Sequence, residues 1–253
     1  MTRRLLLAGL AASALVAAAS AQPAPLTVFA ASDLAFALGE IVPRFEKNLG
    51  VKVTLVLGST GNLAQQIQHG APADVFFAAD ESFVDRLVER GVLIPQTRAL
   101  YAQGRLALAT ARSARGPKLT DLRQLLDSRV RHVAIANPVH APYGRAAQQA
   151  LTTLGLWETV RPKLVYGENI RQTLQYVQTG AVEAGIVAVS IVAVPEIEWV
   201  PIDPRLHAPL NQMAAVVKRS PRPELGLALI QFVNGPEGRP IMKRYGFLLP
   251  GEF

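Results

Sequence analysis

The chain has 253 residues, with 26 lysines and arginines against 19 aspartates and glutamates, and it contains no cysteine. Without cysteine there can be no disulfide, no thiolate metal site and no thioether-linked lipid, and the four histidines are too scattered for a metal-binding spacing. The formal charge of +7 comes from basic residues spread along the chain, and only 6% of residues are aromatic, so the composition does not indicate a nucleic-acid-binding protein.

The N-terminus has the pattern of an export signal. Two arginines precede an apolar run over 5–19, which ends in the small residues ASA at 19–21. A membrane anchor is the alternative, but the run is shorter than the roughly 20 residues that a spanning helix needs, and polar Gln22 follows it. We therefore predict a cleaved signal peptide over 1–21 and a periplasmic location.

Strand-like and helix-like segments then alternate along the chain. The first strand-like run, 26–31, leads directly into a helical stripe over 34–49, in which Pro43 is expected to kink or restart the helix. Further strands are predicted over 51–57, 74–79, 105–110, 132–137, 163–167, 185–189, 198–202 and 214–218, and further helices over 63–70, 83–91, 147–155 and 170–180. Glycine closes each helical stripe, and the alternation predicts an α/β fold with mostly parallel sheets.

No single linker divides the chain, so two lobes would have to interleave. The segments QGRLALAT and NQMAAVVK each read as a strand that could pass from one lobe to the other. They divide the chain into a first lobe over 25–106 plus 213–253 and a second lobe over 107–212.

At four places a predicted strand or short loop ends in small or polar residues and a helix begins at once. In an α/β sheet such helix starts lie at the carboxyl ends of strands, where ligands bind. Each start has unpaired N–H groups and the positive end of a helix dipole, so several together would form an anion site without lysine or arginine. Several of these residues are also ordinary helix caps, so the anion site depends on the four starts converging. The junctions are Ser32-Asp33, Ser59-Thr60-Gly61-Asn62, Ala141-Pro142-Tyr143-Gly144 and Glu168-Asn169-Ile170.

Enzyme motifs fit the sequence poorly. The segment GSTGN at 58–62 is neither a G-x-S-x-G nucleophile elbow nor a P-loop, because it lacks the Gly-Lys-Ser/Thr ending of the latter. Asp74 and Asp80 lie at opposite ends of one predicted strand, which disfavours a catalytic pair. An exported hydrolase that uses Ser59 or Thr60 stays open as an alternative, although the sequence shows no evident base partner for either hydroxyl.

Five segments of the chain are specific enough to indicate a family. They are VFAASDLAFAL, LGSTGNLAQQIQHGAPADVFFAAD, ANPVHAPYGRAAQQAL, GENIRQTLQYVQTGAVEAGIVA and FVNGPEGRPIMKRYGF. In this order they resemble the periplasmic molybdate-binding proteins of ABC transporters. The resemblance implies a two-lobed periplasmic binding protein of type II, with two crossing strands as the hinge, which closes on molybdate or tungstate and delivers it to a membrane permease.

This resemblance implies a transport protein and not an enzyme, with no cofactor. Molybdenum would arrive only as molybdate, so no protein atom would ligate the metal directly. We expect a monomer. Another small oxyanion, sulfate or phosphate, is the alternative ligand on the same fold.

The resemblance also implies which residues contact the oxyanion. Ser32 matches a serine or threonine whose hydroxyl and N–H contact the anion, and Thr60 matches a second hydroxyl. Tyr143 and Ile170 match positions at which the backbone N–H is the donor. The neighbouring residues Ser59 and Asn169 are additional candidates.

Asp33 follows Ser32, at a position where some members of the family add a further backbone or polar contact. A carboxylate that faced a dianion would repel it, so we expect Asp33 to cap its helix or face outward and to contribute only its N–H. Some members also supply a tyrosine hydroxyl from the strand that begins Gly-Ile-Val. Ala188 stands near that place here, so the chain resembles the subgroup without this tyrosine.

Overall fold

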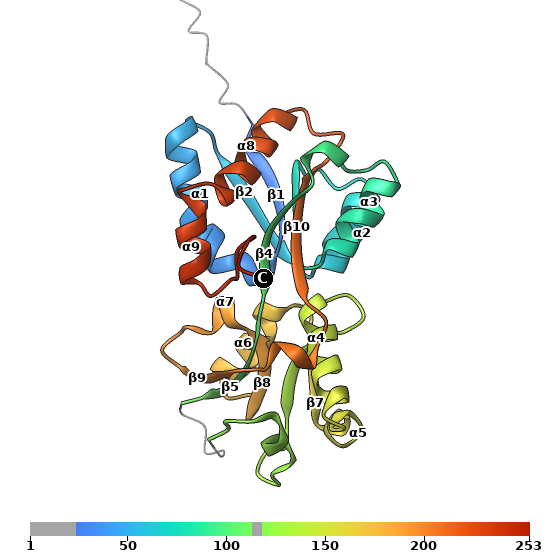
Figure 1. The fold of residues 1–253 in the computed structure, drawn as a ribbon, viewed down its shortest axis with the longest axis vertical. Coiled ribbons are helices and arrows are strands. Elements are labelled where there is room, and N and C mark those ends of the chain that lie inside the picture. The colour runs from blue at the N-terminus through green and yellow to red at the C-terminus, as the bar shows by residue number, and fades with distance from the viewer. Residues whose placement is uncertain (1–23, 113–117) are drawn as a thin grey trace, which may run out of the picture.

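The computed structural model describes residues 24–112 and 118–253, which form two lobes, one above the other in Figure 1. The predicted signal peptide over 1–21 lies outside the described residues. Each lobe is built on a five-stranded sheet, and the chain passes between the sheets from β4 to β5 and returns from β9 to β10. The first crossing lies within the predicted segment QGRLALAT, and the second comes just before NQMAAVVK.

The first sheet has the strand order β2-β1-β3-β10-β4. Its first three strands are parallel, and β10 is antiparallel to both of its neighbours. The strands are β2 (Val53–Gly58), β1 (Leu26–Ala31), β3 (Val75–Ala78), β10 (Leu210–Val216) and β4 (Ala99–Gly104). The helices of this lobe are η1 (Ser32–Leu34), α1 (Ala35–Leu49), α2 (Thr60–Gln68), α3 (Glu81–Glu89), η2 (Pro95–Thr97), α8 (Pro223–Asn234) and α9 (Gly238–Arg244).

The second sheet repeats this arrangement with the order β7-β6-β8-β5-β9, in which β5 is the reversed strand. Its strands are β7 (Leu164–Gly167), β6 (Val133–Ala136), β8 (Ala184–Ala188), β5 (Leu106–Ala111) and β9 (Ile197–Pro201). The helices are η3 (Leu122–Leu126), α4 (Pro142–Thr153), α5 (Trp157–Val160), η4 (Arg161–Lys163), α6 (Ile170–Gln178), α7 (Val189–Val192) and η5 (Pro204–Leu206). Both sheets are therefore mixed, with one strand opposed to the other four.

Strand pairing shifts the lobe boundaries from those predicted at 106/107 and 212/213. Leu106 pairs with Ala188 in the second sheet, and 210–212 pair with β4 in the first sheet. Arg105 is the residue between the two sheets, and its guanidinium donates to the carbonyl of Gly246 at 2.7 Å. A continuous apolar run gives no sign of where the chain leaves one sheet for the other, so the predicted boundaries fall inside strands.

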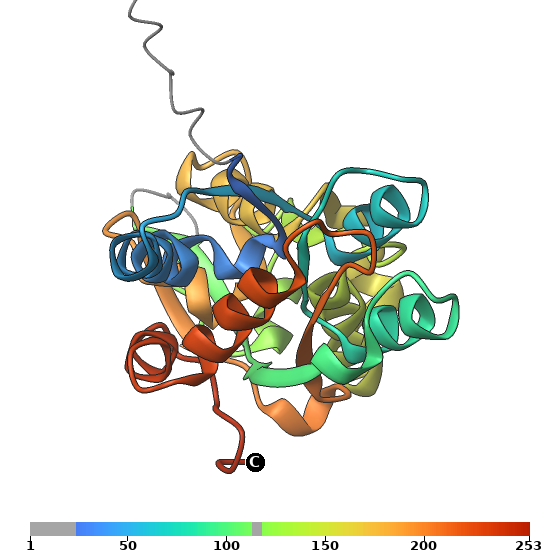
Figure 2. The same cartoon turned by 90° about the horizontal axis from the view of Figure 1, so that it is seen from above.

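Helices cover both faces of the first sheet, as the view from above shows (Figure 2). The crossovers β1–α1–β2 and β2–α2–β3 run in opposite directions along the sheet, so right-handed connections place α1 and α2 on opposite faces. Each face of the sheet has its own hydrophobic core, and alternate side chains of β1 pack into one or the other. Val28 and Ala30 pack with α1, α8 and α9, whereas Phe29 packs with α2 and α3. The period of two in this strand is therefore a consequence of burial on both faces.

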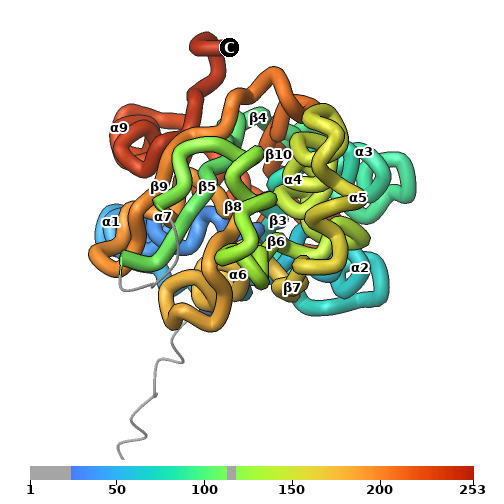
Figure 3. The backbone as a smooth tube through the Cα atoms, turned by 90° about the horizontal axis from the view of Figure 1, so that it is seen from below, coloured from blue at the N-terminus to red at the C-terminus, as the bar shows by residue number. Residues whose placement is uncertain are grey.

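The second lobe has the same layers, seen from below in Figure 3. Its crossovers β6–α4–β7 and β7–α6–β8 again run in opposite directions, so α4 and α6 lie on opposite faces of the sheet. The two lobes thus share a topology that no repeat in the sequence reveals. Among the helices of the described ranges, none has the length and apolar character of a membrane span.

Local signals in the sequence predicted most element ends. Gly91 and Gly180 follow α3 and α6 with φ of 67° and 70°, a left-handed conformation that glycine adopts without strain. The predicted restart at Pro43 is wrong, because α1 continues through this exposed residue as one helix. Strand β4 (Ala99–Gly104) was not predicted, because β5 follows after one residue and the two read as one segment, and helices α5, α7, α8 and α9 were also missed.

Candidate anion-binding site

A small cavity lies between the two lobes. Its lining comes from all four predicted junctions, and the five residues predicted to contact an anion all lie on it. The lining residues are Ala31, Ser32, Asp33, Gly58, Ser59, Thr60 and Ala79 of the first lobe and Ala141, Pro142, Tyr143 and Ile170 of the second.

The strand order explains why the four helix starts converge. In the first lobe η1 follows β1 and α2 follows β2, and in the second lobe α4 follows β6 and α6 follows β7. Each of these strand pairs is parallel, so the two carboxyl ends share one edge of the sheet. The cavity lies between these two edges, and four helix N-termini therefore direct their unpaired N–H groups at one small volume.

The two predicted hydroxyls are held in different ways. Thr60 is the first residue of α2, and its Oγ1 accepts a hydrogen bond from the N–H of Ala79 at 3.0 Å. Because the oxygen acts as the acceptor, the hydroxyl hydrogen is free to donate into the cavity. Ser32 donates its hydroxyl to Oδ1 of Asn169 in the other lobe at 3.3 Å, a long bond that a ligand oxygen could replace.

The N–H of Ile170 is left free by the cap of its own helix. Asn169 precedes α6, and its Oδ1 accepts from the N–H groups of Arg171 and Gln172 at 3.0 and 3.1 Å. The cap thus serves the second and third residues of α6 and leaves the first N–H for the cavity. Asn169 therefore acts on this site as a helix cap and as the partner of Ser32.

The N–H of Tyr143 is the corresponding donor at the start of α4. Pro142, the first residue of this helix, has no N–H, and the N–H groups of Gly144 and Arg145 bond to the carbonyl of Ala141. Tyr143 comes too early in the helix to have a carbonyl partner four residues before it. Its N–H and that of Ile170 are thus available on the second lobe's side of the cavity.

The side chain of Asp33 is placed differently from the prediction. It neither caps the helix nor faces outward, because the residue is 0% exposed and η1 has no side-chain cap. Its Oδ2 accepts hydrogen bonds from the hydroxyl of Tyr143 at 2.9 Å and from Nε2 of Gln212 at 2.6 Å. These partners lie 110 and 179 positions away, so a local helix pattern could not indicate them.

Burial shifts the pKa values of Asp33 and Tyr143. Desolvation raises the pKa of the Asp33 carboxyl from 3.8 to about 6, although the hydrogen bonds from Gln212 and Tyr143 lower it. Desolvation also raises the pKa of the Tyr143 hydroxyl well above its usual value, and the negative charge of Asp33 adds to this rise. Tyr143 is therefore a protonated donor at any physiological pH.

Ser59 makes a contact with the other lobe that sequence reasoning missed. Its Oγ lies 2.8 Å from Nδ1 of His140, and the N–H of Gly61 donates to the carbonyl of His140 at 2.9 Å. A Cβ on Gly61 would lie 2.7 Å from that carbonyl oxygen, so the lobes can meet here only because residue 61 is glycine. The one signal for His140 in the sequence is its place directly before the Ala141-Pro142 helix start.

Two further contacts join the lobes at the rim of the cavity. Arg145 of α4 donates to Oδ2 of Asp80 at 2.6 Å, and its guanidinium lies 5.2 Å from the ring centre of Phe83. Asn62 donates to Oε1 of Glu168. With these contacts and the buried bonds to Asp33, the structure is a closed state in which the lobes touch around the cavity.

The chemistry of the lining fits an anion better than a cation. The lining contains hydroxyls, helix N-termini and the carboxyl of Asp33, but no lysine or arginine. In residues 24–112 and 118–253, no three histidine, aspartate or glutamate side chains are grouped as a metal site would require. Neutral dipoles are therefore the groups that would balance the charge of a bound ion.

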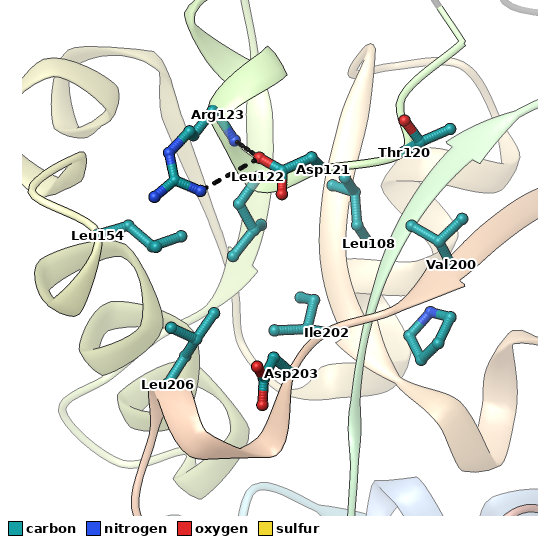
Figure 4. Close-up of a pocket in the computed structure, with 11 residues that line it drawn as sticks. Leu108, Thr120, Asp121, Leu122, Arg123, Leu154, Val200, Ile202, Asp203 and Leu206 are labelled. Atoms are coloured by element: carbon teal, nitrogen blue, oxygen red, sulfur yellow. Dashed lines mark hydrogen bonds and ion pairs between the residues drawn. The ribbon is translucent and has the colours of Figure 1, made fainter.

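A larger cavity lies within the second lobe, and none of the predicted site residues borders it (Figure 4). Its walls include Leu108, Leu122 and Leu154, and its charged groups already have partners. Asp121 pairs with Arg123, as Figure 4 shows, and Asp203 pairs with Arg205. This cavity offers no convergent donors for an anion.

Fold and site together define a class: a two-lobed binding protein that encloses a small ligand between its lobes. The family model for bacterial extracellular solute-binding proteins matches residues 26–248. The chain therefore belongs to the family of bacterial extracellular solute-binding proteins.

Several relatives of this chain are molybdate-binding proteins. The molybdate-binding protein ModA of Azotobacter vinelandii is 37% identical over 238 residues, which cover 91% of this chain and 92% of the relative. ModA of Rhodobacter capsulatus is 37% identical over 212 residues, which cover 83% of this chain and 82% of the relative. The solved structure of the periplasmic molybdate-binding protein of A. vinelandii matches with a TM-score of 0.82 at 31% identity, covering 89% of this chain and 99% of that one.

Proposed function

We propose that this protein captures molybdate or tungstate between its lobes in the periplasm and delivers it to a membrane ABC permease. The observation that carries the proposal is the convergence of four helix N-termini and two hydroxyls on one closed cavity without a cation. The similarity to molybdate-binding proteins over nearly their whole length supports the choice of ligand. Export by the signal over 1–21 and action as a monomer, without a cofactor, complete the proposal.

The oxyanion would be held by the hydroxyls of Ser32 and Thr60 and by the N–H groups of Tyr143 and Ile170, with the first turn of η1 adding N–H donors. Hydrogen bonds to a charged group contribute about 1.5–3 kcal/mol each. Several such bonds, set against the desolvation of a dianion, leave room for the roughly 8 kcal/mol that corresponds to micromolar affinity. Because the donors are neutral, the empty site between rounds of transport buries no fixed cation.

Calorimetric titration of the ligand-free protein with molybdate, tungstate, sulfate and phosphate tests the proposal. We expect micromolar or tighter binding of molybdate and tungstate, and weaker binding of sulfate because its shorter bonds leave it further from the donors. Absence of heat with both molybdate and tungstate would overturn the proposal. Tight binding of phosphate in their place would favour the alternative oxyanion, since a protonated phosphate could donate to an ionised Asp33.

The contact between Ser59 and His140 is a specific observation in favour of a hydrolase, because a serine beside a histidine can act as a nucleophile with its base. Two features oppose it. The two residues come from different lobes, so opening the cleft to admit a substrate would separate them. In the described ranges no acid hydrogen-bonds to His140 to orient it. We propose that the protein is not an enzyme, and ester turnover that disappears in both Ser59→Ala and His140→Ala would contradict this.

A further inference from the structure

Three side chains from three elements form a buried polar cluster beside the cavity. Asp33 comes from η1, Tyr143 from α4 in the other lobe, and Gln212 from the crossing strand β10. Besides the two bonds to Oδ2 of Asp33, Nε2 of Gln212 donates to the hydroxyl of Tyr143 at 3.0 Å. The cluster therefore joins both lobes and the hinge, and it forms only when the lobes close.

The cluster lacks hydrogen-bond donors for two of its oxygens. The hydroxyl hydrogen of Tyr143 and both amide hydrogens of Gln212 are used in these bonds. Two oxygens, Oδ1 of Asp33 and Oε1 of Gln212, are buried without a hydrogen-bond partner. Unpartnered buried acceptors are rare and costly, so the ionised form of this cluster is incomplete.

Within the described ranges, no positive charge compensates Asp33. The titratable groups that act on it are the hydroxyls of Tyr143 and Tyr101, both protonated. Ser190 of α7 is neutral and donates only to the backbone carbonyl of Asp33.

The basic residues of α6 and α4, which pack against Asp33, already have other partners. Arg171 of α6 lies over the ring of Phe36, and Arg145 of α4 pairs with Asp80. A dianion in the cavity would therefore add repulsion to a carboxylate that already lacks a counterion.

We propose that Asp33 is protonated on Oδ1 when the oxyanion is bound, so that its carboxyl group donates a hydrogen bond to the ligand and capture of the dianion takes up one proton from solvent. Oδ2 is held by Tyr143 and Gln212, and Asp33 lines the cavity whereas Gln212 does not, so Oδ1 is the oxygen left to face the ligand. The proton gives Oδ1 the hydrogen that it lacks and removes the repulsion, whereas Oε1 of Gln212 keeps no partner. This inference rests on the proposed function, and the raised pKa of Asp33 in the closed protein supports it.

Proton uptake makes the affinity depend on pH. Above the pKa of Asp33 in the free protein and below its pKa in the complex, the Kd for molybdate should rise about tenfold for each unit of pH. Asp33→Asn places a permanent donor at the same position, so its Kd should be independent of pH and near the wild-type value at the acid end. Asp33→Ala, which has no donor, should bind more weakly than Asp33→Asn at every pH.

Calorimetric titration with molybdate, in buffers of different ionisation enthalpy between about pH 6.5 and 8.5, measures the proton uptake directly. We expect proton uptake by the wild type, an increase in Kd of up to about 100-fold across this range, and no uptake for Asp33→Asn. Glu168→Gln is the matched control, because it neutralises an exposed acid at the interface between the lobes and should keep the uptake.

The outcomes separate this inference from the proposed function. Binding of molybdate by the wild type without proton uptake, or uptake that persists in Asp33→Asn, would overturn the inference and leave the proposed function intact. Absence of molybdate binding at every pH would overturn the proposed function, and the inference with it. The wild-type measurement alone decides the matter if a variant fails to fold.

Discussion

Two buried carboxylates of the first lobe, Asp74 and Asp33, have opposite surroundings. Both oxygens of Asp74 are satisfied within the lobe: Oδ2 accepts from the N–H of Thr27 at 2.7 Å and from Arg222 at 3.1 Å, and Oδ1 accepts from the hydroxyl of Ser220 at 2.6 Å. Asp33 receives bonds on one oxygen only, from neutral groups of the other lobe and the hinge strand.

This difference between Asp74 and Asp33 distinguishes side chains that stabilise one lobe from side chains that take part in closure of the two lobes. A carboxylate whose partners lie in its own lobe keeps them whether the cleft is open or closed, so it contributes to folding. A carboxylate whose partners arrive with the other lobe is completed only by closure and by what the cavity holds. Changes within a lobe should therefore alter the free energy of unfolding and spare binding, and changes between the lobes should do the reverse.

The largest effect on unfolding is expected from Asp74→Ala. Removing this carboxylate takes the acceptor from the Ser220 hydroxyl and the Thr27 N–H and one partner from the half-buried Arg222, which should lower the free energy of unfolding by about 2–4 kcal/mol. Urea denaturation measures this, while the Kd for molybdate of the folded protein should stay within about twofold. Asp85→Ala, which breaks an exposed ion pair with Arg98, is the control and should cost less than about 1 kcal/mol. Unchanged unfolding with weakened binding in Asp74→Ala would contradict the comparison.

Closure of the ligand-free protein should depend on pH through Asp33. The carboxyl has a pKa of about 6 in the closed protein and an ordinary value of 3.8 in water, so protonation favours the closed state. Protonation of Asp33 therefore contributes about 3 kcal/mol to the free energy of closure. This contribution is complete below pH 3.8 and is lost as the pH rises to about 6. Small-angle scattering should therefore show a larger radius of gyration above pH 6 than near pH 4, and Asp33→Asn should abolish the change. A radius that does not vary with pH in the wild type would show that Asp33 does not bias closure.

Ser32→Ala should weaken molybdate binding and leave unfolding nearly unchanged. The serine hydroxyl makes only a long bond to Asn169 without ligand, so little stability is lost with it. Losing one hydrogen bond to a dianion should cost about 1.5–3 kcal/mol, or roughly 10- to 150-fold in Kd. Ser128→Ala, an exposed serine far from the cleft in sequence, should change neither quantity. If Ser32→Ala unfolded the protein without altering affinity, Ser32 would be a structural helix cap.

Gly61→Ala tests the contact between the lobes without touching the cavity's donors. The added methyl group would lie 2.7 Å from the carbonyl oxygen of His140, so closure would have to strain the contact by about 1–3 kcal/mol. We expect a Kd for molybdate raised by about 5- to 150-fold and an unchanged melting temperature for the ligand-free protein. The same substitution at Gly39, which has open space around its Cβ position, is the control. A wild-type Kd in Gly61→Ala would show that the ligand-bound lobes do not meet as they do here.

The sequence allowed the helix starts to be predicted because they depend on neighbouring residues. Asp80 caps α3, with its Oδ1 accepting from the N–H of Ser82 at 2.8 Å, and Asn169 caps α6 in the same way. Convergence of the four starts on one cavity was the condition that the sequence left open, and the structure meets it. A helix start depends on residues close together in the chain, so the sequence alone predicts it.

The direction of Asp33 and the partner of Ser59 could not be predicted, because they depend on contacts between lobes. Asp33 has the pattern of a helix cap, yet closure brings Tyr143 and Gln212 to it from distant parts of the chain. His140 approaches Ser59 only when the lobes meet. The parts of the site that the sequence missed are thus those made by closure.

The most direct test of the central claim is a crystal structure of the protein with molybdate, in which anomalous scattering locates the molybdenum. We expect one molybdenum peak in the cavity between the lobes, with molybdate oxygens within hydrogen-bond distance of the Ser32 and Thr60 hydroxyls and of the N–H groups of Tyr143 and Ile170. A molybdenum peak elsewhere on the protein, or none in this cavity at saturating molybdate, would contradict the account.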